Sequence, residues 1–493
     1  MKFKACLYAT TITGFTALAV SVSAAQIEQP ANQVAQSNGS SLMQISRDPY
    51  TDPTAQHATE VEPVMVANGD TIVTAFQVGR FQGAGSDNIG WATSKDGGKT
   101  WTNGFLARTS TLVGGSWHSV SLPTLAYDKK HGMYLIAMMP FGKQGSGRGI
   151  LVSRSSDGLN WKGPVVAATS FGTNGHWLAC DNTAKSPFYG NCYDAYWDYS
   201  SGTASLNNLV TSHDGGVTWS SPVSSPDQLA GLVTSMAIQP SGNLVILGRN
   251  GGPDGTQEYA IPSVDGGVSL QATANITTNL FDFPFMRADP SPSSAVDSEG
   301  IIYVVFPDCR FRSNCVDPFD VSACRFTTDN TSCPTNDLVL TKSMDGVSWS
   351  EPRRIPIDPV TSGTDHFITG LGVFNDPNDS DKEGRANSDG AHTKLALTYY
   401  YLPNGRTCSE TTCRVDAGFI SSDDGGRSWN EAAKIAGPML QTWLVPTYAG
   451  EMVADYISAV FVAGKPYSAF AIAHRPDPKT GQFSEAIYAV ELP

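Results

Sequence analysis

A short motif recurs along this 493-residue chain, and its spacing constrains the fold more than any other feature. The motif reads Ser-x-Asp-x-Gly-x-Thr/Ser-Trp, with two copies one residue shorter. Its Asp can accept backbone N–H bonds in a tight turn, its Gly supplies a positive φ, and its Trp covers the turn. The copies span residues 94–101, 155–161, 212–219, 263–270, 343–349 and 422–429, with Leu270 replacing Trp in the fourth.

The spacing of the motif predicts a repeated sheet. Successive motif aspartates are 51 to 80 residues apart, a strand-like stretch precedes the motif, and another strand pair lies earlier in each unit. No long segment has helical periodicity. Six or seven units of about four antiparallel strands indicate an all-β fold, a β-propeller. We favour seven, because residues 451–492 form a unit without the motif, and residues 41–46 supply its missing strand and close the open edges.

The repeated turns resemble the Asp-boxes of the sialidase-like (BNR-repeat) β-propellers over about residues 50–490. The resemblance implies that the boxes are structural turns at the outer rim and that function lies where the inner strands meet a central channel. Sialidases hold the substrate carboxylate with three arginines, the first of them in an Arg-Ile-Pro motif ahead of the first box. Here Arg354-Ile355-Pro356 follows the fifth box, so we expect a chain outside the sialidases proper.

Charge excludes two classes of partner. The chain has 46 acidic and 32 basic residues and a formal net charge of −14. A net acidic protein is repelled by the phosphates of nucleic acids and by anionic lipid surfaces. We therefore expect no nucleic acid partner and no membrane association. A monomer is also expected.

The N-terminal residues predict export. Lys2 and Lys4 precede an apolar stretch over residues 5–22 and a small-residue cleavage site, so residues 1–25 read as a signal peptide. Residues 26–493 are then one propeller domain, secreted or periplasmic. Eight cysteines remain after cleavage, and disulfides are typical of exported proteins. Their simplest pairing is local, at 180–192, 309–315, 324–333 and 408–413, while metal thiolates are the alternative and lack a C-x2-C motif.

Carboxylates near the predicted starts of the first strands are the catalytic candidates. One protonated and one ionised carboxyl group can cleave a glycosidic bond, and a Tyr beside a carboxylate can act as a nucleophile. Each group can also be a solvated strand end or a buried hydrogen-bonded side chain. The catalytic candidates are His57, Glu60, Glu62, Asp365, Asp455 and Tyr456.

A second set of residues is predicted to bind substrate. Arginines between disulfides suit bidentate binding of a carboxylate or sulfate, and unpaired aromatic and His side chains suit stacking and hydrogen bonding to sugars. Local ion pairs and ordinary packing are the alternatives. The substrate-binding candidates are Arg287, Arg310, His176, Trp177 and His366.

No cofactor is expected, and one loop has alternating oxygen ligands that a structural calcium ion could use. Those residues are Asp376, Asn378, Asp379 and Asp381, and a solvated acidic turn is the other interpretation.

These observations favour a secreted, glycan-active hydrolase that cleaves a glycosidic bond by acid/base catalysis, with an acidic sugar held by arginines. A non-catalytic carbohydrate- or protein-binding propeller remains the main alternative, because a fold does not determine a function. A lyase acting on uronic acid polysaccharides is the third.

Overall fold

The computed structural model describes residues 33–493, except 38–39, 201–204, 228–229, 253–254, 282–285, 289, 314, 316–334, 376–391, 406 and 410. The predicted signal peptide, the 324–333 cysteine pair and the proposed calcium loop lie outside the described residues. The described part is all-β, as predicted, with two 3-10 turns at Thr111–Val113 and Gln441–Trp443. Among these residues no helix is long and apolar enough to cross a membrane.

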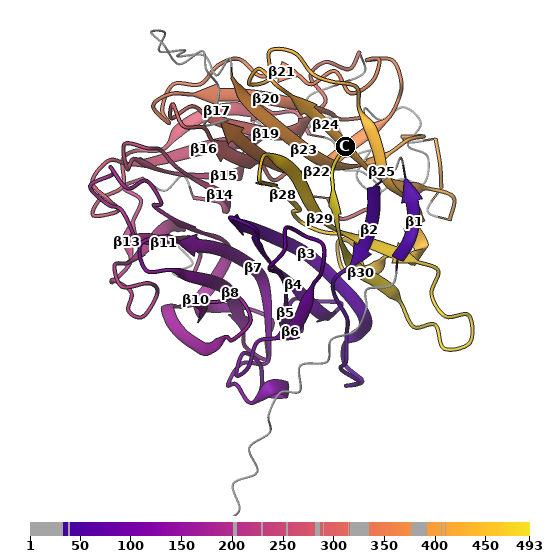
Figure 1. Cartoon of the computed structure of the whole chain (residues 1–493), viewed down its shortest axis with the longest axis horizontal. Helices are drawn as coiled ribbons and strands as arrows, with labels where there is room; N and C mark the ends of the chain where they lie inside the picture. Colours follow the sequence, from indigo (N-terminus) through magenta and orange to yellow (C-terminus); the bar gives the residue numbers. More distant parts are fainter. Residues whose placement is uncertain are drawn as a thin grey trace, which may run out of the picture. The chain divides into compact units, whose positions relative to one another are not determined.

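Most strands fall into consecutive antiparallel sets of four (Figure 1). The second and third sets share one long strand, because the start of β10 pairs with β9 and its end pairs with β11. The strands of the first three sets are β3 (Gln56–Asn68), β4 (Thr71–Arg80), β5 (Ser86–Ser94), β6 (Thr102–Phe105), β7 (Ser119–Asp128), β8 (Met133–Phe141), β9 (Gly147–Ser155), β10 (Lys162–Cys180), β11 (Cys192–Asp198), β12 (Leu206–Ser212) and β13 (Val223–Ser224).

Three further sets follow as separate four-stranded sheets. They are built from β14 (Leu232–Ile238), β15 (Leu244–Gly252), β16 (Gly255–Ser263), β17 (Ala274–Asn279), β18 (Ser293–Val296), β19 (Ile302–Asp308), β20 (Asp337–Ser343), β21 (Arg353–Arg354), β22 (Asp365–Asn375), β23 (Thr393–Leu402), β24 (Arg414–Ser422) and β25 (Ala433–Leu440). A short ribbon, β26 (Val445–Thr447) with β27 (Gly450–Met452), follows them.

The last set joins the two ends of the described chain. It contains β28 (Ser458–Val462), β29 (Lys465–His474) and β30 (Ser484–Glu491), and the N-terminal strand β2 (Ser40–Gln44) pairs with β30. Strand β1 (Gln33–Ser37) pairs with β2, and Figure 1 shows β1 and β2 beside β30. The prediction that an N-terminal segment completes the last set is therefore confirmed.

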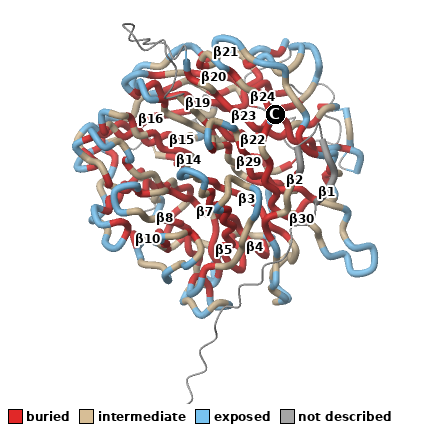
Figure 2. The backbone as a smooth tube through the Cα atoms, in the orientation of Figure 1, coloured by how far each residue is buried: buried red, intermediate tan, exposed pale blue. Residues whose placement is uncertain are grey.

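The first strands of the sets contact one another in a cycle. Contacts run from β3 to β7, β10, β14, β18, β22 and β28, and β28 returns to β3. Apolar side chains of neighbouring sets pack together between these strands, as in the cluster that joins Val73 and Ile89 with Val120 and Ile136. Figure 2 shows that buried segments follow the strands and that exposed segments follow the turns between them.

The six motif copies form tight turns that share two hydrogen bonds to the motif aspartate, one from the Ser hydroxyl and one from a backbone N–H. In the first, the Ser94 hydroxyl donates to Asp96 Oδ1 (2.8 Å), and that oxygen accepts the N–H of Thr100 (2.9 Å). The Trp101 indole N–H donates to the carbonyl of Gly98 (3.1 Å). The aspartate of every other copy accepts the corresponding backbone N–H. The side chains of the motif therefore hold each hairpin turn internally.

Three of the predicted disulfides are present: Cys180–Cys192, Cys309–Cys315 and Cys408–Cys413. The first links β10 to β11 at their paired ends. Disulfides of this kind are typical of exported proteins.

A buried carboxyl group supports the junction of the chain ends. The Ser46 hydroxyl donates to Glu60 Oε2 (2.6 Å) and accepts the N–H of Ile487 in β30 (2.7 Å). Burial raises the pKa of Glu60 from 4.5 to about 8. Glu60 is 2% exposed and therefore stays protonated in the folded protein near neutral pH.

We expect Glu60→Gln to flatten the pH dependence of stability. Between pH 4.5 and 8 the folded state keeps the Glu60 proton and the unfolded state loses it, so the free energy of unfolding falls as pH rises. One such group contributes about 1.4 kcal/mol per pH unit. Urea unfolding at pH 5, 6, 7 and 8 should show a shallower slope for Glu60→Gln, and the exposed control Glu431→Gln should keep the wild-type slope.

Candidate active site

A cavity of about 480 Å³ lies where the first strands of all the sets meet. Its lining includes residues of β3, β7, β10, β14, β18, β22 and β28, together with the end of β4 and the segments before β18 and β28. Much of the wall carries hydroxyl groups, among them Ser121, Ser235, Ser293, Thr369 and Ser458. Polar cavities of this size, with a few charged groups, are typical of small-molecule sites.

Two carboxyl groups are in contact beside this cavity. Asp455 lies in its wall, and its carboxyl group is hydrogen-bonded to that of Glu62, which is fully buried. Among the described residues no N–H or hydroxyl donor reaches Glu62 Oε1, and the contact between the two carboxyl groups is favourable when they share one proton. Such a pair titrates as a unit that carries one proton and one negative charge.

The surroundings determine which carboxyl group holds the proton. Burial, and next the charge of Asp455, raises the pKa of Glu62 from 4.5 to about 8. Burial opposes ionisation of Asp455 as well, but Arg287 outweighs it and holds the pKa of Asp455 below its ordinary value. The Arg287 guanidinium donates from Nε to Asp455 Oδ1 (2.8 Å) and forms an ion pair with Oδ2. Near neutral pH, Glu62 is therefore the acid and Asp455 the carboxylate.

A bulge sets the position of Glu62. The pairing of β3 with β4 slips between Val61 and Val64, and Glu62 has φ 56°. Positive φ is uncommon for any residue except Gly, and bulges often redirect side chains near functional sites. Comparable bulges with positive φ lie at Leu122 in β7 and Ile368 in β22, so Glu62 occupies a recurrent bend of the first strands.

Arg80 at the end of β4 brings a second positive charge. It is 2% exposed and lines the cavity, and its guanidinium donates to the carbonyls of Phe81 (3.0 Å) and Gly85 (2.8 Å). Burial and the neighbouring Arg287 lower its pKa to about 10. Arg80 and Arg287 outweigh the single negative charge of the carboxyl pair, so the site favours an anionic group.

Tyr456 and Trp177 form an aromatic wall. Their rings meet edge to face with centroids 5.5 Å apart. The Tyr456 hydroxyl donates to the carbonyl of Pro123 (2.6 Å). Burial, and next the charges of Glu62 and Asp455, raises the pKa of Tyr456 well above its ordinary value, so the phenol is neutral in this arrangement.

His176 also lines the cavity, but both of its ring nitrogens have partners. Nδ1 lies 3.2 Å from the carboxylate oxygens of Asp194, and Nε2 lies 2.8 Å from the carbonyl of Leu122. The ring is 3% exposed. His176 therefore joins β10 to the bulge of β7.

Five of the predicted residues line the cavity, namely Arg287, His176, Trp177, Asp455 and Tyr456, and Glu62 contacts Asp455 without itself lining the cavity. The sequence analysis did not select two further polar residues: Arg80, and Gln77, whose amide donates to Glu62 Oε2. Gln77 and Arg80 both lie on β4, the strand that pairs with β3. Polar residues on the strand paired with a candidate first strand are the sequence feature that could have identified them.

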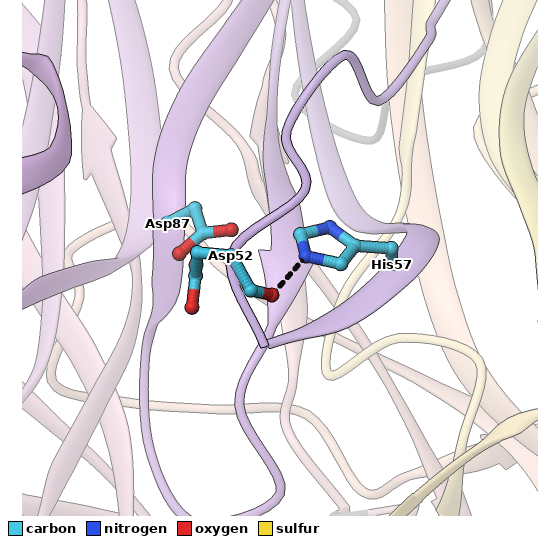
Figure 3. A group of neighbouring side chains, drawn as sticks. All are labelled: Asp52, His57 and Asp87. Carbon is cyan, nitrogen blue, oxygen red and sulfur yellow. Dashed lines mark hydrogen bonds between the residues drawn. The ribbon is translucent and has the colours of Figure 1, made fainter. Parts of the chain in front are cut away.

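The other predicted residues lie outside the cavity lining. Glu60 contacts Ser46 as described, and Arg310 forms an ion pair with Asp308 (2.7 Å). The buried carboxyl group of Asp365 accepts the amide N–H of Asn336 (2.8 Å). His366 faces the carbonyl of Asn336 (3.0 Å), and His57 lies against Asp48 and Asp52, as part of the cluster in Figure 3.

Comparison with known proteins gives structural likeness alone. No protein-family model and no curated protein matches the chain. The phage phi92 endosialidase is similar with a TM-score of 0.48 and 12% identity over 92% of this chain and 69% of its own. A mutant of Trypanosoma rangeli sialidase is similar with a TM-score of 0.45 and 12% identity over 94% of this chain and 60% of its own. The α-L-arabinofuranosidase Arb93A of Fusarium graminearum is similar with a TM-score of 0.40 and 16% identity over 77% of this chain and 96% of its own. Because these scores are below 0.5, activity has to be inferred from the chain's own residues.

Removal of the Asp455 charge should change the titration of Glu62. With ¹³C-labelled glutamate side chains, the carboxyl signal that disappears in Glu62→Gln identifies Glu62. We expect that signal to titrate in Asp455→Asn at least about one pH unit lower than in the wild type, because a neighbouring like charge no longer opposes ionisation. An unchanged midpoint would contradict the coupling of the two groups.

Proposed function

We propose that the domain expected at residues 26–493 is a seven-bladed β-propeller of the sialidase-like type and that the cavity on its axis is an active site. The contact cycle of the first strands, the four-stranded sets and the recurrent motif turns support this interpretation. The pairing of β2 with β30 fits a propeller closed by an N-terminal strand.

The proposed activity is hydrolysis of a glycosidic bond with a proton supplied by the Glu62–Asp455 pair. The observation that carries this proposal is the contact between the carboxyl groups of Glu62 and Asp455 beside Arg287, in surroundings that move their pKa values in opposite directions. Two carboxyl groups whose surroundings separate their pKa values are the usual means of acid/base catalysis at neutral pH.

In the proposed reaction, the proton that Glu62 shares with Asp455 passes by way of the Asp455 carboxyl group, which lines the cavity, to the leaving glycosidic oxygen. The bond from that oxygen to the sugar carbon breaks at the same time. Water then adds to the sugar carbon, and the proton that it loses returns to the carboxyl pair. While both carboxylates are ionised, Arg287 and Arg80 stabilise their charge. The net positive charge of this cluster favours a sugar that itself carries an anionic group.

The aromatic wall gives the substrate its second contact in this proposal. Trp177 and Tyr456 present ring surfaces to the cavity, and the hydroxyl groups of Ser235, Ser293 and Ser458 can bond to sugar hydroxyls. An apolar face with polar groups at its border is what a pyranose ring requires.

A specific observation favours a second candidate, a non-catalytic glycan-binding propeller. The polar groups of the site already bond to other protein groups. Arg287 donates to Asp455, and the Tyr456 hydroxyl donates to the carbonyl of Pro123. The two ring nitrogens of His176 face Asp194 and the carbonyl of Leu122. A site of this kind can bind a sugar without reacting with it. Turnover distinguishes the two candidates.

A glycoside panel tests the proposal. We expect the wild type to cleave sialosides or uronides in preference to neutral glycosides, and Glu62→Gln and Asp455→Asn to lose at least about 100-fold in kcat, as is usual for general acid/base groups. The exposed Asp477→Asn variant should retain wild-type rates. Binding on a glycan array without turnover of any substrate would establish the binding candidate instead.

The pH dependence of the reaction provides a separate test. Because Glu62 must be protonated, kcat/KM should fall as pH rises through about 8, the pKa of Glu62. In Asp455→Asn the remaining activity should decline at lower pH, in parallel with the lowered pKa of Glu62. An alkaline limb that does not move in this variant would assign the proton to another group.

A further inference from the structure

Two tyrosines at the edge of the cavity expose their rings to solvent. Tyr448 is 84% exposed and Tyr199 is 40% exposed, and every other tyrosine that the structure describes is more deeply buried. Tyr199 lines the cavity itself, and Tyr448 contacts a residue of the lining, as described below. Because the burial of an aromatic ring is favourable, rings that stay in water beside a cavity mark a surface that binds a ligand.

Exposed apolar side chains of another kind have a different location. Several large ones lie in the motif turns, where they occupy variable positions, and the cavity lining contains none of them. They are Val217, Val264, Val268, Met344 and Val347. Exposed aliphatic groups are therefore a property of the turns, whereas the exposed tyrosine rings are found at the cavity.

Tyr199 is held in a fixed position just after β11. Its N–H donates to the carbonyl of Gly172 (2.8 Å), and the centroid of its ring lies 5.2 Å from that of Trp197. A Cβ atom at Gly172 would approach the Tyr199 ring to 2.9 Å, so the backbone of this glycine lies directly against the ring. The protein supports the ring from these sides and leaves the rest of its surface open at the cavity.

Asn174 on β10 adds a polar group to the same part of the wall. Its Oδ1 accepts the N–H of Gly175 (3.0 Å), which fixes the direction of the side chain. Among the described residues none accepts a hydrogen bond from its Nδ2 atom, and Asn174 lines the cavity. Asn174 pairs with Trp197, two residues before Tyr199, so the amide and the ring lie at the same end of the β10–β11 pair. An apolar ring beside an amide donor suits a sugar, which has both C–H faces and hydroxyl groups.

Tyr448 lies in the turn between β26 and β27. Its ring contacts Gly83, where a Cβ atom would lie 3.4 Å from Tyr448 Cε2, and Gly83 lines the cavity. The β26–β27 ribbon is fastened to the candidate site, because the N–H of Arg287 donates to the carbonyl of Glu451 in β27 (2.9 Å). The ribbon therefore connects Tyr448 to the arginine that binds Asp455.

The two tyrosines lie on different sides of the cavity. Tyr199 belongs to the third set of strands, and Gly83, which Tyr448 contacts, follows β4 in the first set. The second set lies between them, since the contacts of the first strands run from β3 to β7 and then to β10. A ligand that fills the cavity and continues past its edge on either side meets one of these rings.

We propose that Tyr199 with Asn174, and Tyr448 on the other side, bind the sugar units that flank the unit held in the cavity. The substrate class is then an oligosaccharide or polysaccharide chain with an anionic sugar in the cavity, rather than a glycoside of a single unit. Tyrosine suits this task, because its ring offers a broad apolar face at a small cost in conformational entropy and its hydroxyl group remains in water. This inference rests on the proposed function of the cavity as a site for an anionic sugar.

Calorimetric titration of the full-length Glu62→Gln protein tests the proposal without turnover. The ligands are tetragalacturonate, tetrasialic acid and the two corresponding monosaccharides. We expect one tetramer to bind at least about 10-fold more tightly than its own monosaccharide, as one well-stacked ring can provide. In the same background, Tyr199→Ala and Tyr448→Ala should each remove most of this advantage and leave the affinity for the monosaccharide unchanged.

Matched variants separate ring stacking from other effects. Tyr199→Phe and Tyr448→Phe keep the ring and should keep the advantage of the tetramer. Tyr189→Ala, on the loop at the opposite end of the β10–β11 pair, should also keep it. Circular dichroism identifies an alanine variant that fails to fold, and the corresponding Tyr→Leu variant then replaces it.

Three results would overturn the proposal. They are failure of both tetramers to bind, equal affinity for each tetramer and its monosaccharide, and an advantage of the tetramer that both alanine variants retain. Turnover by the wild type tests the proposed function separately. Binding of a tetramer that depends on the tyrosines, with no cleavage, would leave this inference standing and contradict hydrolysis. Cleavage of single-unit glycosides with no advantage of a tetramer would do the reverse.

Discussion

The candidate active site depends on contact between the two ends of the chain. Strand β2 pairs with β30, and β28 packs against β3, so the last set of strands meets the first. This contact brings Asp455 to Glu62 across nearly four hundred residues of sequence. The protonation of each carboxyl group depends on its neighbours: burial and Asp455 keep the proton on Glu62, while Arg287 keeps the charge on Asp455.

The sequence predicted the fold well because the recurrent turns are local. Each motif stabilises its own hairpin turn through hydrogen bonds that span at most four residues, so the turn does not depend on distant parts of the chain. The candidate site was predicted in part, because a residue near the start of a first strand has a fair chance of facing the axis. The sequence did not predict that Glu60 would bond to Ser46 while Glu62 contacts Asp455. A bulge with a positive φ at Glu62 breaks the two-residue alternation that would place both side chains on one face of the strand.

Several residues that were predicted to bind substrate or to act in catalysis instead bond to other residues of the protein. Arg310 was selected as an anion binder, yet Asp308 lies two residues away and pairs with it. The buried Asp365 and His366 likewise bond to Asn336. A buried charge must be paired, and a sequence does not reveal whether the partner will be a neighbour or a ligand. Arg80 was missed for the opposite reason, because its two carbonyl partners and its place at the cavity depend on tertiary structure.

The long strand β10 has a consequence for how the chain can be divided. It ends one set of strands and begins the next without an intervening turn, pairing with β9 through Thr173 and with β11 from the same residue onward. The repeats are therefore not modular at this point. A circular permutant opened within β10 would lose the edge of two sheets at once, whereas one opened at a motif turn would interrupt a single hairpin. Duplication or exchange of single units is open to the three sets that form separate four-stranded sheets, but the second and third sets would have to be inherited together.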